Sequence, residues 1–260
     1  MARQTFELAG TLSLQIMNLV GRRIIGGEFK VGQTLPTEPA LCDQLGVSRT
    51  TVREAIRKLQ GKGLLRTAPK IGTTVQPTDH WNQLDSDILR WRVESGPDDA
   101  VLLQLYELRA ALEPEACKLA ASHGHAADHA AIVEAMDRID ASLGDPDATI
   151  VADVEFHMAI VAATRNMFFI SMTSAIRTAL EVTFKLSAKR RGFPRAELAL
   201  HRQLRDALVA RQGDAAAAIM KDLLAASRRS AKLREAPTEL KSIPTRRAFA
   251  ARRRGRSAAF

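Results

Sequence analysis

The sequence lacks any long hydrophobic run and any targeting segment. No stretch of apolar residues reaches the roughly 18–20 residues that a membrane-spanning helix requires. Residues 1–10 include Arg3 and Glu7 and contain no apolar core of the kind that a secretory signal peptide needs. We therefore expect a cytoplasmic protein that has no membrane partner.

Cysteines and aromatic residues are also scarce. The two cysteines, Cys42 and Cys117, lie far apart without the spacing of a zinc motif, so the sequence predicts no disulfide framework. Aromatic residues make up 5% of the chain, whereas alanine and leucine are abundant, which favours helices over a β-sandwich or barrel. The 260 residues are 46% hydrophobic and 26% charged, so they can bury the core of one large domain or of two ordinary domains.

The net charge of +9 is distributed unevenly along the chain. Residues 1–79 carry 11 Lys and Arg against 6 Asp and Glu, residues 80–230 carry 18 against 21, and residues 231–260 carry 9 against 2. A basic stretch suits a polyanion, because neutralising phosphates releases counterions. For the carboxyl-terminal stretch, solubility is an equally good explanation.

The first eighty residues carry the signals of three helices followed by a β-hairpin. Apolar residues recur at helical spacing, Thr37 and Ser48 are suited to cap helices, and glycines follow the expected helix ends. The predicted helices cover residues 8–25, 37–45 and 49–60, and the predicted strands cover residues 64–67 and 73–76. Two helices joined by a tight glycine turn and followed by a hairpin have the arrangement of a winged helix-turn-helix.

The second helix of this predicted helix-turn-helix has two different faces. Its buried stripe consists of Val52, Ala55, Ile56 and Leu59. Arg49, Thr50 and Arg53 lie on the opposite, amino-terminal part, which is the part of a recognition helix that enters the major groove. Ser48 and Thr51 can donate to phosphate, helped by the helix amino terminus. The alternative is that Ser48 only caps the helix and that the arginines are only solvated.

Five short stretches of this segment form a long and specific motif. They are Gly27-Glu28, residues 35–38, residues 46–55, residues 63–65 and residues 72–75. The motif resembles that of the GntR family of bacterial transcriptional regulators. The resemblance implies a homodimer that binds a short palindromic operator in double-stranded DNA. The DNA-contacting positions that it implies are Ser48, Arg49, Thr50, Thr51, Arg53, Lys70 and Gly72.

One position departs from the family pattern. Many relatives carry arginine directly after the glutamate of the Leu-Pro-x-Glu motif, where it contacts DNA, whereas this chain has Pro39. The resemblance therefore implies that this contact is absent and that the operator differs. At the tip of the predicted wing, Lys70 is suited to follow the DNA backbone or to enter the minor groove.

From Trp81 onward the sequence shows helical stretches and no convincing strand. The predicted helices cover residues 81–94, 98–122, 126–143, 147–165, 167–190, 195–212 and 214–231. Seven helices in about 150 residues indicate an antiparallel, all-helical bundle, so the predicted fold class is mainly α. The last residues lack periodicity, and we interpret them as a disordered basic tail.

Two motifs of the helical region carry a second resemblance. Residues 106–116 and residues 153–160, with Asn166 after them, resemble the all-helical FCD ligand domain of the FadR subgroup. Together with the front end, the resemblance covers roughly residues 10–230. We therefore expect a winged helix-turn-helix DNA-binding domain over residues 8–77, a linker helix over 78–94, an all-helical effector-binding and dimerisation domain over 95–232, and the tail over 233–260.

Asp153 and His157 share one face of a predicted helix, because they are four residues apart. A carboxylate and an imidazole one turn apart can hold a divalent metal such as zinc, nickel or manganese, and His201 can supply a third ligand. The resemblance to metal-binding relatives implies a fourth ligand, a histidine, at the position where this chain has Leu223. Three interpretations stay open: a three-ligand site that water or effector completes, a metal-free effector pocket, or a purely structural hydrogen bond between Asp153 and His157.

Arg109 lies on the first long helix of the predicted effector domain. In the family, an arginine at this position faces the cavity, and its fork can clamp an effector carboxylate. The alternative is a surface ion pair with Glu113, which contributes little to stability. Asn166 is better explained as a helix cap than as a ligand contact.

Two other clusters have ordinary structural explanations. His123, His125 and His129 lie at a glycine-containing helix junction, where a solvated loop explains them better than a metal site does. Trp81 and Trp91 flank a string that resembles the linker of regulators responding to sugar acids such as galactonate, although packing is the default explanation for both. The string supports an acidic, hydroxylated effector.

The sequence thus predicts a ligand-responsive DNA-binding regulator, in our interpretation a repressor that a small carboxylate or sugar acid releases from its operator. We expect no enzyme, because no nucleophile motif accompanies the candidate metal ligands. The alternatives are a metal-responsive regulator in which the ion is the signal, a metal-dependent enzyme, and an activator in place of a repressor.

Overall fold

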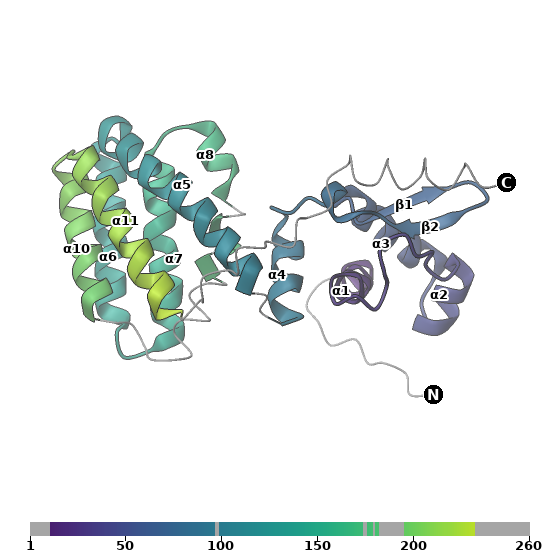
Figure 1. Ribbon diagram of the computed structural model, residues 1–260. Coiled ribbons are helices and arrows are strands. Elements are labelled where there is room, and N and C mark those ends of the chain that lie inside the picture. Colours follow the sequence, from purple (N-terminus) through teal and green to yellow (C-terminus); the bar gives the residue numbers. More distant parts are fainter. Residues whose placement is uncertain (1–10, 97–98, 174–175, 179, 182–194, 232–260) are drawn as a thin grey trace. The chain divides into compact units, whose positions relative to one another are not determined.

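The computed structural model describes residues 11–96, 99–173, 176–178, 180–181 and 195–231 of the chain. These residues are mainly helical, and they fall into two compact units, one up to residue 96 and one from residue 99 onward. Figure 1 shows a β-hairpin in the first unit and, among the described residues, helices alone in the second. The predicted fold class is therefore confirmed.

Unit 1 (residues 11–96) has the element order of a winged helix-turn-helix. Its elements are α1 (Leu12–Ile25), α2 (Glu38–Leu45), α3 (Arg49–Gly61), β1 (Leu65–Ala68), β2 (Gly72–Val75), the short 3-10 helix η1 (Thr78–His80) and α4 (Ser86–Glu94). The α3 helix packs against both α1 and α2. Its apolar stripe closes one core with Ile16 of α1 and Leu41 of α2.

The turn between α2 and α3 forms for local reasons. The Thr37 side chain accepts a hydrogen bond from the backbone N–H of Ala40 and caps α2. Gly46 has a φ of 67°, a left-handed conformation that glycine adopts without steric cost, and ends α2. The Ser48 side chain accepts from the backbone N–H of Thr51 and caps α3. All three predicted signals are confirmed.

The β-hairpin turns more tightly than predicted. The strands pair antiparallel, with Leu65 opposite Val75 and Ala68 opposite Gly72, so three residues form the tip. Lys70 and Gly72 have φ angles of 62° and 92°, and this pair of left-handed residues lets the chain reverse within that short span. For this reason β1 ends one residue later, and β2 begins one residue earlier, than the sequence predicts.

The α4 helix belongs to the core of unit 1. It begins at Ser86, and not at the predicted residue 81, because the Asp85 carboxylate accepts hydrogen bonds from the first backbone N–H groups of the helix. Trp91 of α4 is fully buried over Gly21 of α1, where a Cβ would overlap the indole ring. Trp81 is buried in the same core, so the packing explanation is confirmed for both tryptophans.

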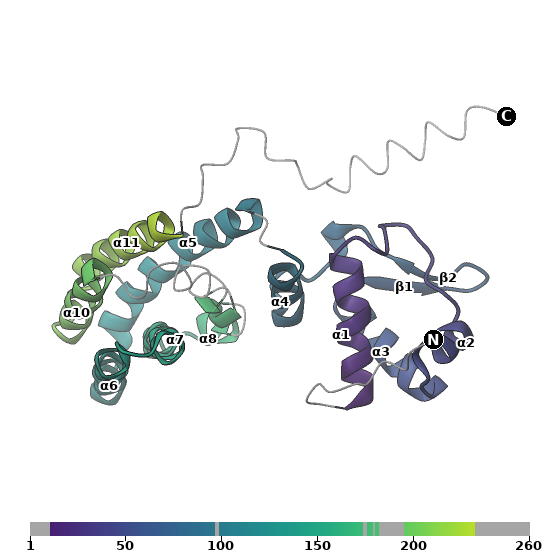
Figure 2. The ribbon, with the colours of Figure 1, turned by 90° about the horizontal axis from the view of Figure 1, so that it is seen from below.

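Unit 2 (residues 99–231) is a bundle of long helices. Its elements are α5 (Asp99–His123), α6 (Ala126–Ser142), α7 (Pro146–Ala163), α8 (Met167–Ser171), α10 (Arg195–Val209) and α11 (Gly213–Ser230). The α6 helix packs against α7, and α11 packs against both α5 and α10. Figure 2 shows α6 and α7 nearly end on and side by side.

The α7 helix lies between two apolar clusters. One contains Phe156 and Ile160 and reaches α5, α6, α10 and α11. The other contains Val154 and Met158 on a different side of the helix. A helix with apolar neighbours on several sides is buried, and its polar side chains are buried with it. This placement explains why Thr149, Asp153 and His157 of α7 are buried.

Two helix ends of unit 2 differ most from the prediction. The helix predicted over residues 167–190 begins as expected, with the Asn166 side chain capping it through the backbone N–H of Phe168, but α8 already ends at Ser171. The α10 helix ends at Val209, because the left-handed Arg211 leaves the helix and donates to two carbonyls at the end of α5. Part of the predicted 167–190 helix, and the predicted basic tail over 233–260, lie outside the described residues.

The described residues contain no helix that is both long and apolar enough to cross a membrane.

Candidate functional site

The α3 helix presents a polar face to solvent. Its predicted stripe of Val52, Ala55, Ile56 and Leu59 is buried. Arg49, Thr50 and Arg53 are exposed on the other side, at the amino-terminal part of the helix. The structure therefore leaves accessible the side chains that the sequence predicts to read DNA.

Three of the predicted DNA contacts have partners within unit 1. The hydroxyl oxygens of Ser48 and Thr51 lie 2.8 Å apart, and Ser48 also caps α3. Arg53 Nε lies 3.9 Å from a carboxylate oxygen of Glu38, and both side chains are exposed. An exposed pair of this kind contributes little to stability, so Arg53 can exchange Glu38 for a phosphate or a base at small cost.

The wing tip is basic and accessible. Lys70 and Gly72 are both exposed at the turn of the hairpin. Arg57 of α3 and Arg66 of β1 are also exposed, although the sequence does not predict them as DNA contacts. Their spacing carries no motif, so only their exposure in the folded unit identifies them as possible phosphate contacts.

Unit 2 contains a buried network of ionisable side chains from three helices. Arg109 and Glu113 come from α5, Asp153 and His157 from α7, and His201 from α10. Each of the five is at most 3% exposed. Burying charged groups is costly unless they are paired, and the pairs within this network offset that cost.

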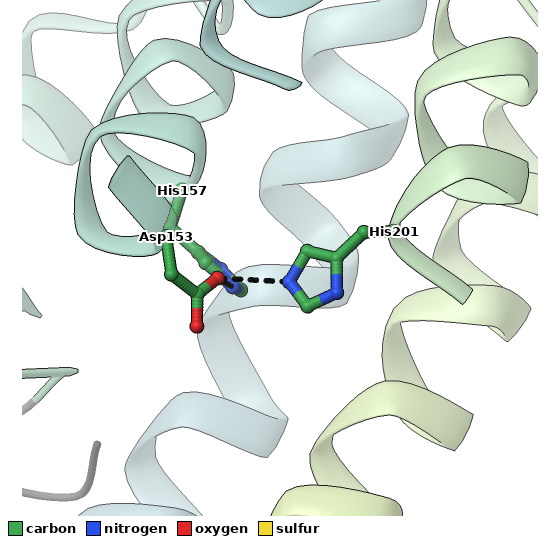
Figure 3. A group of neighbouring side chains, drawn as sticks. All are labelled: Asp153, His157 and His201. Carbon is green, nitrogen blue, oxygen red and sulfur yellow. Dashed lines mark hydrogen bonds and ion pairs between the residues drawn. The ribbon is translucent and has the colours of Figure 1, made fainter. Parts of the chain in front are cut away.

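Asp153, His157 and His201 converge as the sequence predicts. Figure 3 shows the two residues of α7 facing His201 of α10. His201 Nε2 lies 2.8 Å from Asp153 Oδ1, and His157 Nε2 lies 3.6 Å from the same oxygen. One ligand atom from each of the three residues falls within 4.8 Å of the others. The three therefore meet the distance requirement for binding one ion.

The Nδ1 atoms of His157 and His201, which we call the outer nitrogens, both face oxygen atoms. His157 Nδ1 lies 2.9 Å from Glu113 Oε2, within ion-pair range although not as a well-aligned hydrogen bond. His201 Nδ1 lies 2.7 Å from the backbone carbonyl oxygen of Glu197. Metal-binding histidines are commonly held in this way, with the second ring nitrogen donating to a carboxylate or a backbone carbonyl. The arrangement turns both Nε2 atoms toward Asp153 and fits a divalent cation.

Arg109 pairs with Glu113, but not on the surface. Arg109 Nε donates to Glu113 Oε1 at 2.6 Å, and the guanidinium lies over the ring of Tyr106. The alternative of a surface ion pair between Arg109 and Glu113 is wrong, because α5 buries its 109–113 face against α7 and α11. A guanidinium has five donors, so its bond to Glu113 is compatible with a second carboxylate.

The pKa values of two network residues reflect their partners. Burial alone would raise the pKa of Glu113, but Arg109 and His157 outweigh burial and lower this pKa to about 2. Burial alone would lower the pKa of His201, but Asp153 outweighs it and raises this pKa above the usual value. Glu113 is therefore an anion, and the Asp153 carboxylate favours the protonated form of His201.

The end of α11 adds neutral polar groups beside this network. The hydroxyl groups of Tyr106 and Ser227 lie 3.0 Å apart in the interior of the unit. Ser230 donates to the Glu197 carboxylate at 2.6 Å. Burial is the main cause that raises the pKa of Glu197. Glu113 and Glu197 were not predicted as site residues, because nothing in the local sequence shows that Glu113 meets His157 or that the Glu197 carboxylate meets Ser230.

Two other sequence features have a structural role. Leu223, at the position of the implied fourth ligand, is a buried member of the apolar core. His129 is also buried, with Nε2 3.1 Å from the backbone oxygen of Ala120, so the solvated-loop interpretation was wrong for this residue. His123 and His125 are exposed. Across the described ranges, the group of Asp153, His157 and His201 is the one set of three with metal-binding spacing.

Both halves of the chain match known families. Residues 12–75 match the family described as bacterial regulatory proteins, gntR family, and residues 104–226 match the FCD domain. The galactonate operon transcriptional repressor of Escherichia coli strain K12 is 30% identical over 220 residues, which are 84% of this chain and 96% of that protein. YieP of the same strain, described as an uncharacterized HTH-type transcriptional regulator, is 32% identical over 218 residues, which are 83% and 94%.

A solved structure has the same arrangement of elements. It is that of Lar, which controls the expression of the Listeria monocytogenes agr system. The TM-score is 0.59 at 18% identity, and the match covers 88% of this chain and 100% of the other. At this identity the likeness supports the fold alone.

Proposed function

Because the chain belongs to the GntR family of bacterial regulators and carries an FCD domain, we propose that it is a repressor that a small carboxylate or sugar acid releases from a palindromic operator. Members of this family are DNA-binding, ligand-responsive transcriptional regulators and not enzymes. The proposal places the protein in the cytoplasm as a homodimer, with the domain boundaries expected from the sequence at residues 77, 94 and 232.

The proposed DNA interface consists of α3 and the wing. Arg49 and Arg53 would enter the major groove, where an arginine fork can bind guanine and discriminate by about 1–3 kcal/mol. Ser48, Thr50 and Thr51 would contact phosphates beside the helix amino terminus. Lys70 and Gly72 of the wing tip complete the proposed set. Thr51 is half-buried, and the exposure of the other six residues on one unit supports the proposal.

The proposed effector site is the buried network of unit 2. Its strongest support is that Asp153, His157 and His201 bring one carboxylate and two imidazoles within reach of one ion, beside the buried cation Arg109. These three ligands would hold zinc, nickel or manganese, and the ion would supply a Lewis-acidic contact for a carboxylate. Arg109 would bind the same carboxylate through its terminal nitrogens.

Release from DNA requires an effector that prefers one conformation of the regulator. A ligand shifts an equilibrium only by the difference between its affinities for the two states. A coupling of about 1–3 kcal/mol would lower operator affinity roughly 5–150-fold. The likeness to a galactonate operon repressor and the hydroxyls of Tyr106 and Ser227 beside the network support a hydroxylated acid.

The test uses the full-length protein and a palindrome selected from random duplexes. Fluorescence anisotropy then follows binding while galactonate, other sugar acids and unhydroxylated carboxylates are added, each with metal-loaded and with chelated protein. We expect release by a sugar acid in the metal-loaded arm. Failure to select any preferred duplex at moderate salt would contradict the proposed DNA function.

The three-ligand set also favours a second candidate, in which the ion itself is the signal. Zinc titrated into chelated protein on its operator, without any organic acid, distinguishes the two. Release by zinc alone would support the metal-responsive regulator, whereas release only after the acid is added would support the effector-responsive one.

A further inference from the structure

Glu113 lies between the two parts of the proposed effector site. One carboxylate oxygen is 2.6 Å from Arg109 Nε, and the other is 2.9 Å from His157 Nδ1. Each oxygen therefore faces a different partner, one on its own helix and one on α7. A single carboxylate connects the cation proposed to bind the effector with an imidazole proposed to bind the metal.

The position of Glu113 is distinctive among the acidic residues of α5. Glu107 and Glu115 on the same helix are exposed, whereas Glu113 is 3% exposed. A buried carboxylate loses its hydration, and only close, oppositely charged or donating partners offset that loss. Arg109 and His157 are those partners, so the network, and not solvation, holds the charge at this place.

The orientation of the His157 ring depends on what its outer nitrogen meets. An imidazole that donates from Nδ1 carries its lone pair on Nε2, and Nε2 is the atom of His157 that faces Asp153. His201 Nδ1 faces a fixed acceptor on its own helix, the backbone carbonyl oxygen of Glu197. The Nδ1 atom of His157 instead faces a side chain, the Glu113 carboxylate, whose Oε2 lies 2.9 Å away within ion-pair range.

We infer that Glu113 is a positioning residue: its carboxylate sets the His157 ring so that Nε2 faces the divalent cation, and the same carboxylate holds Arg109. This inference rests on the proposed metal-binding function of Asp153, His157 and His201. In this arrangement the Glu113 carboxylate serves both the proposed metal site, through His157, and the proposed effector contact, through Arg109. Loss of Glu113 therefore weakens binding of the metal and of the acid together.

The first experiment uses the native protein. Long-range ¹H–¹⁵N correlation spectra of ¹⁵N-histidine-labelled protein report which imidazole nitrogen carries the proton, before and after zinc is added. We expect His157 to be protonated on Nδ1 in both samples and its Nε2 resonance to move with zinc. A proton on Nε2, with zinc shifting Nδ1, would overturn the inference without any variant.

The second experiment compares Glu113→Gln with Glu115→Gln, which changes an exposed residue of the same helix. A glutamine has one acceptor oxygen for two donors, so His157 or Arg109 loses its acceptor. Removing the partner of a metal-binding histidine typically weakens metal affinity 10–100-fold. By calorimetry we expect zinc affinity to fall by about that factor in Glu113→Gln and to stay native in Glu115→Gln.

A double variant covers the case in which Glu113→Gln does not fold because Arg109 stays buried without its counter-charge. In Arg109→Met with Glu113→Gln, the amide oxygen serves His157 alone, so zinc affinity recovers relative to Glu113→Gln while carboxylate binding is lost. Zinc affinity equal to native in every Glu113 variant would overturn the inference. No zinc binding by the native protein would instead contradict the proposed metal site, and the histidine spectra tell the two failures apart.

Discussion

Arg49 and Arg53 are both exposed at the amino-terminal part of α3, but their surroundings differ. Arg53 lies 3.9 Å from Glu38, whereas Arg49 takes part in none of the ion pairs found among the described residues. Pro39 follows Glu38 at the position where many relatives carry a DNA-contacting arginine. We therefore expect base reading in this chain to depend more heavily on α3 itself.

We expect Arg49→Ala to lose sequence preference as well as affinity, because a bidentate contact to guanine is worth about 1–3 kcal/mol of discrimination. Binding to the selected palindrome and to scrambled duplex is measured at one salt concentration. Arg57→Ala, a change of equal charge further along α3, is the control and should weaken both duplexes similarly. An equal loss on both duplexes for Arg49→Ala would rule out base reading.

Arg109 combines a structural and a proposed ligand-binding role. Its removal leaves Glu113 buried without the cation that lowers its pKa. Breaking a buried pair costs about 3–5 kcal/mol, so Arg109→Ala should lower the melting temperature of unit 2. Lys118 is an exposed cation on the same helix, so Lys118→Ala should leave the melting temperature unchanged.

At a temperature where Arg109→Ala is folded, we expect it to bind the operator normally and to ignore the acid. The reason is that DNA contacts lie in unit 1, whereas the proposed carboxylate contact lies in unit 2. Fluorescence anisotropy of the operator duplex, with and without the acid that releases the native protein, measures operator binding and release. Native release by the variant would remove Arg109 from the effector site.

At the scale of elements, α4 is part of the DNA-reading unit and not a free connector. Lys62, at the end of α3, lies 2.8 Å from carboxylate oxygens of both Asp85 and Asp87. Trp91 donates from Nε1 to the Asn18 side chain of α1. These contacts fasten α4 to two helices of unit 1, so α4 moves with the helix-turn-helix.

We expect Trp91→Ala to lower the unfolding free energy of unit 1 by about 3–5 kcal/mol, the usual cost of truncating a buried aromatic. Urea denaturation followed by circular dichroism measures the change. Leu84→Ala, at a residue that is 41% exposed, serves as the control and should have little effect. A native midpoint for Trp91→Ala would mean that α4 does not stabilise the unit.

At the scale of the whole molecule, the parts proposed to bind DNA and the part proposed to bind the effector differ in net charge. The front end and the carboxyl-terminal residues are basic, while the region that carries the buried network has more acidic than basic residues. Nonspecific DNA affinity depends on the number of phosphates that cations neutralise, and that number sets the salt dependence. The sequence therefore predicts a contribution from the terminal residues even though they lie outside the described part of the chain.

We expect deletion of residues 236–260 to weaken binding to scrambled duplex and to reduce the slope of log affinity against log salt, because the deletion removes phosphate-neutralising cations. Replacing Arg252, Arg253 and Arg254 with glutamine in the full-length chain should give part of the same effect. A slope identical to that of the native protein would show that these residues do not touch DNA.

The sequence by itself determined the local features of this protein. The Gly46 turn, the Ser48 cap and the apolar stripe of α3 each depend on residues only a few positions apart, so their physics is visible in the chain. The same holds for Asp153 and His157, which share a helix face because they are one turn apart. Family resemblance extended these signals to His201 and Arg109.

Only the tertiary structure decided which groups these residues meet. It buried Arg109 with Glu113, brought Glu113 to the outer nitrogen of His157, and placed α4 in the core of unit 1. The physical reason is that Glu113 and His157, like Trp91 and Asn18, are more than 40 positions apart and meet only through the packing of whole helices. Spacing along one helix fixes which side chains share a face, but packing between helices fixes what that face touches.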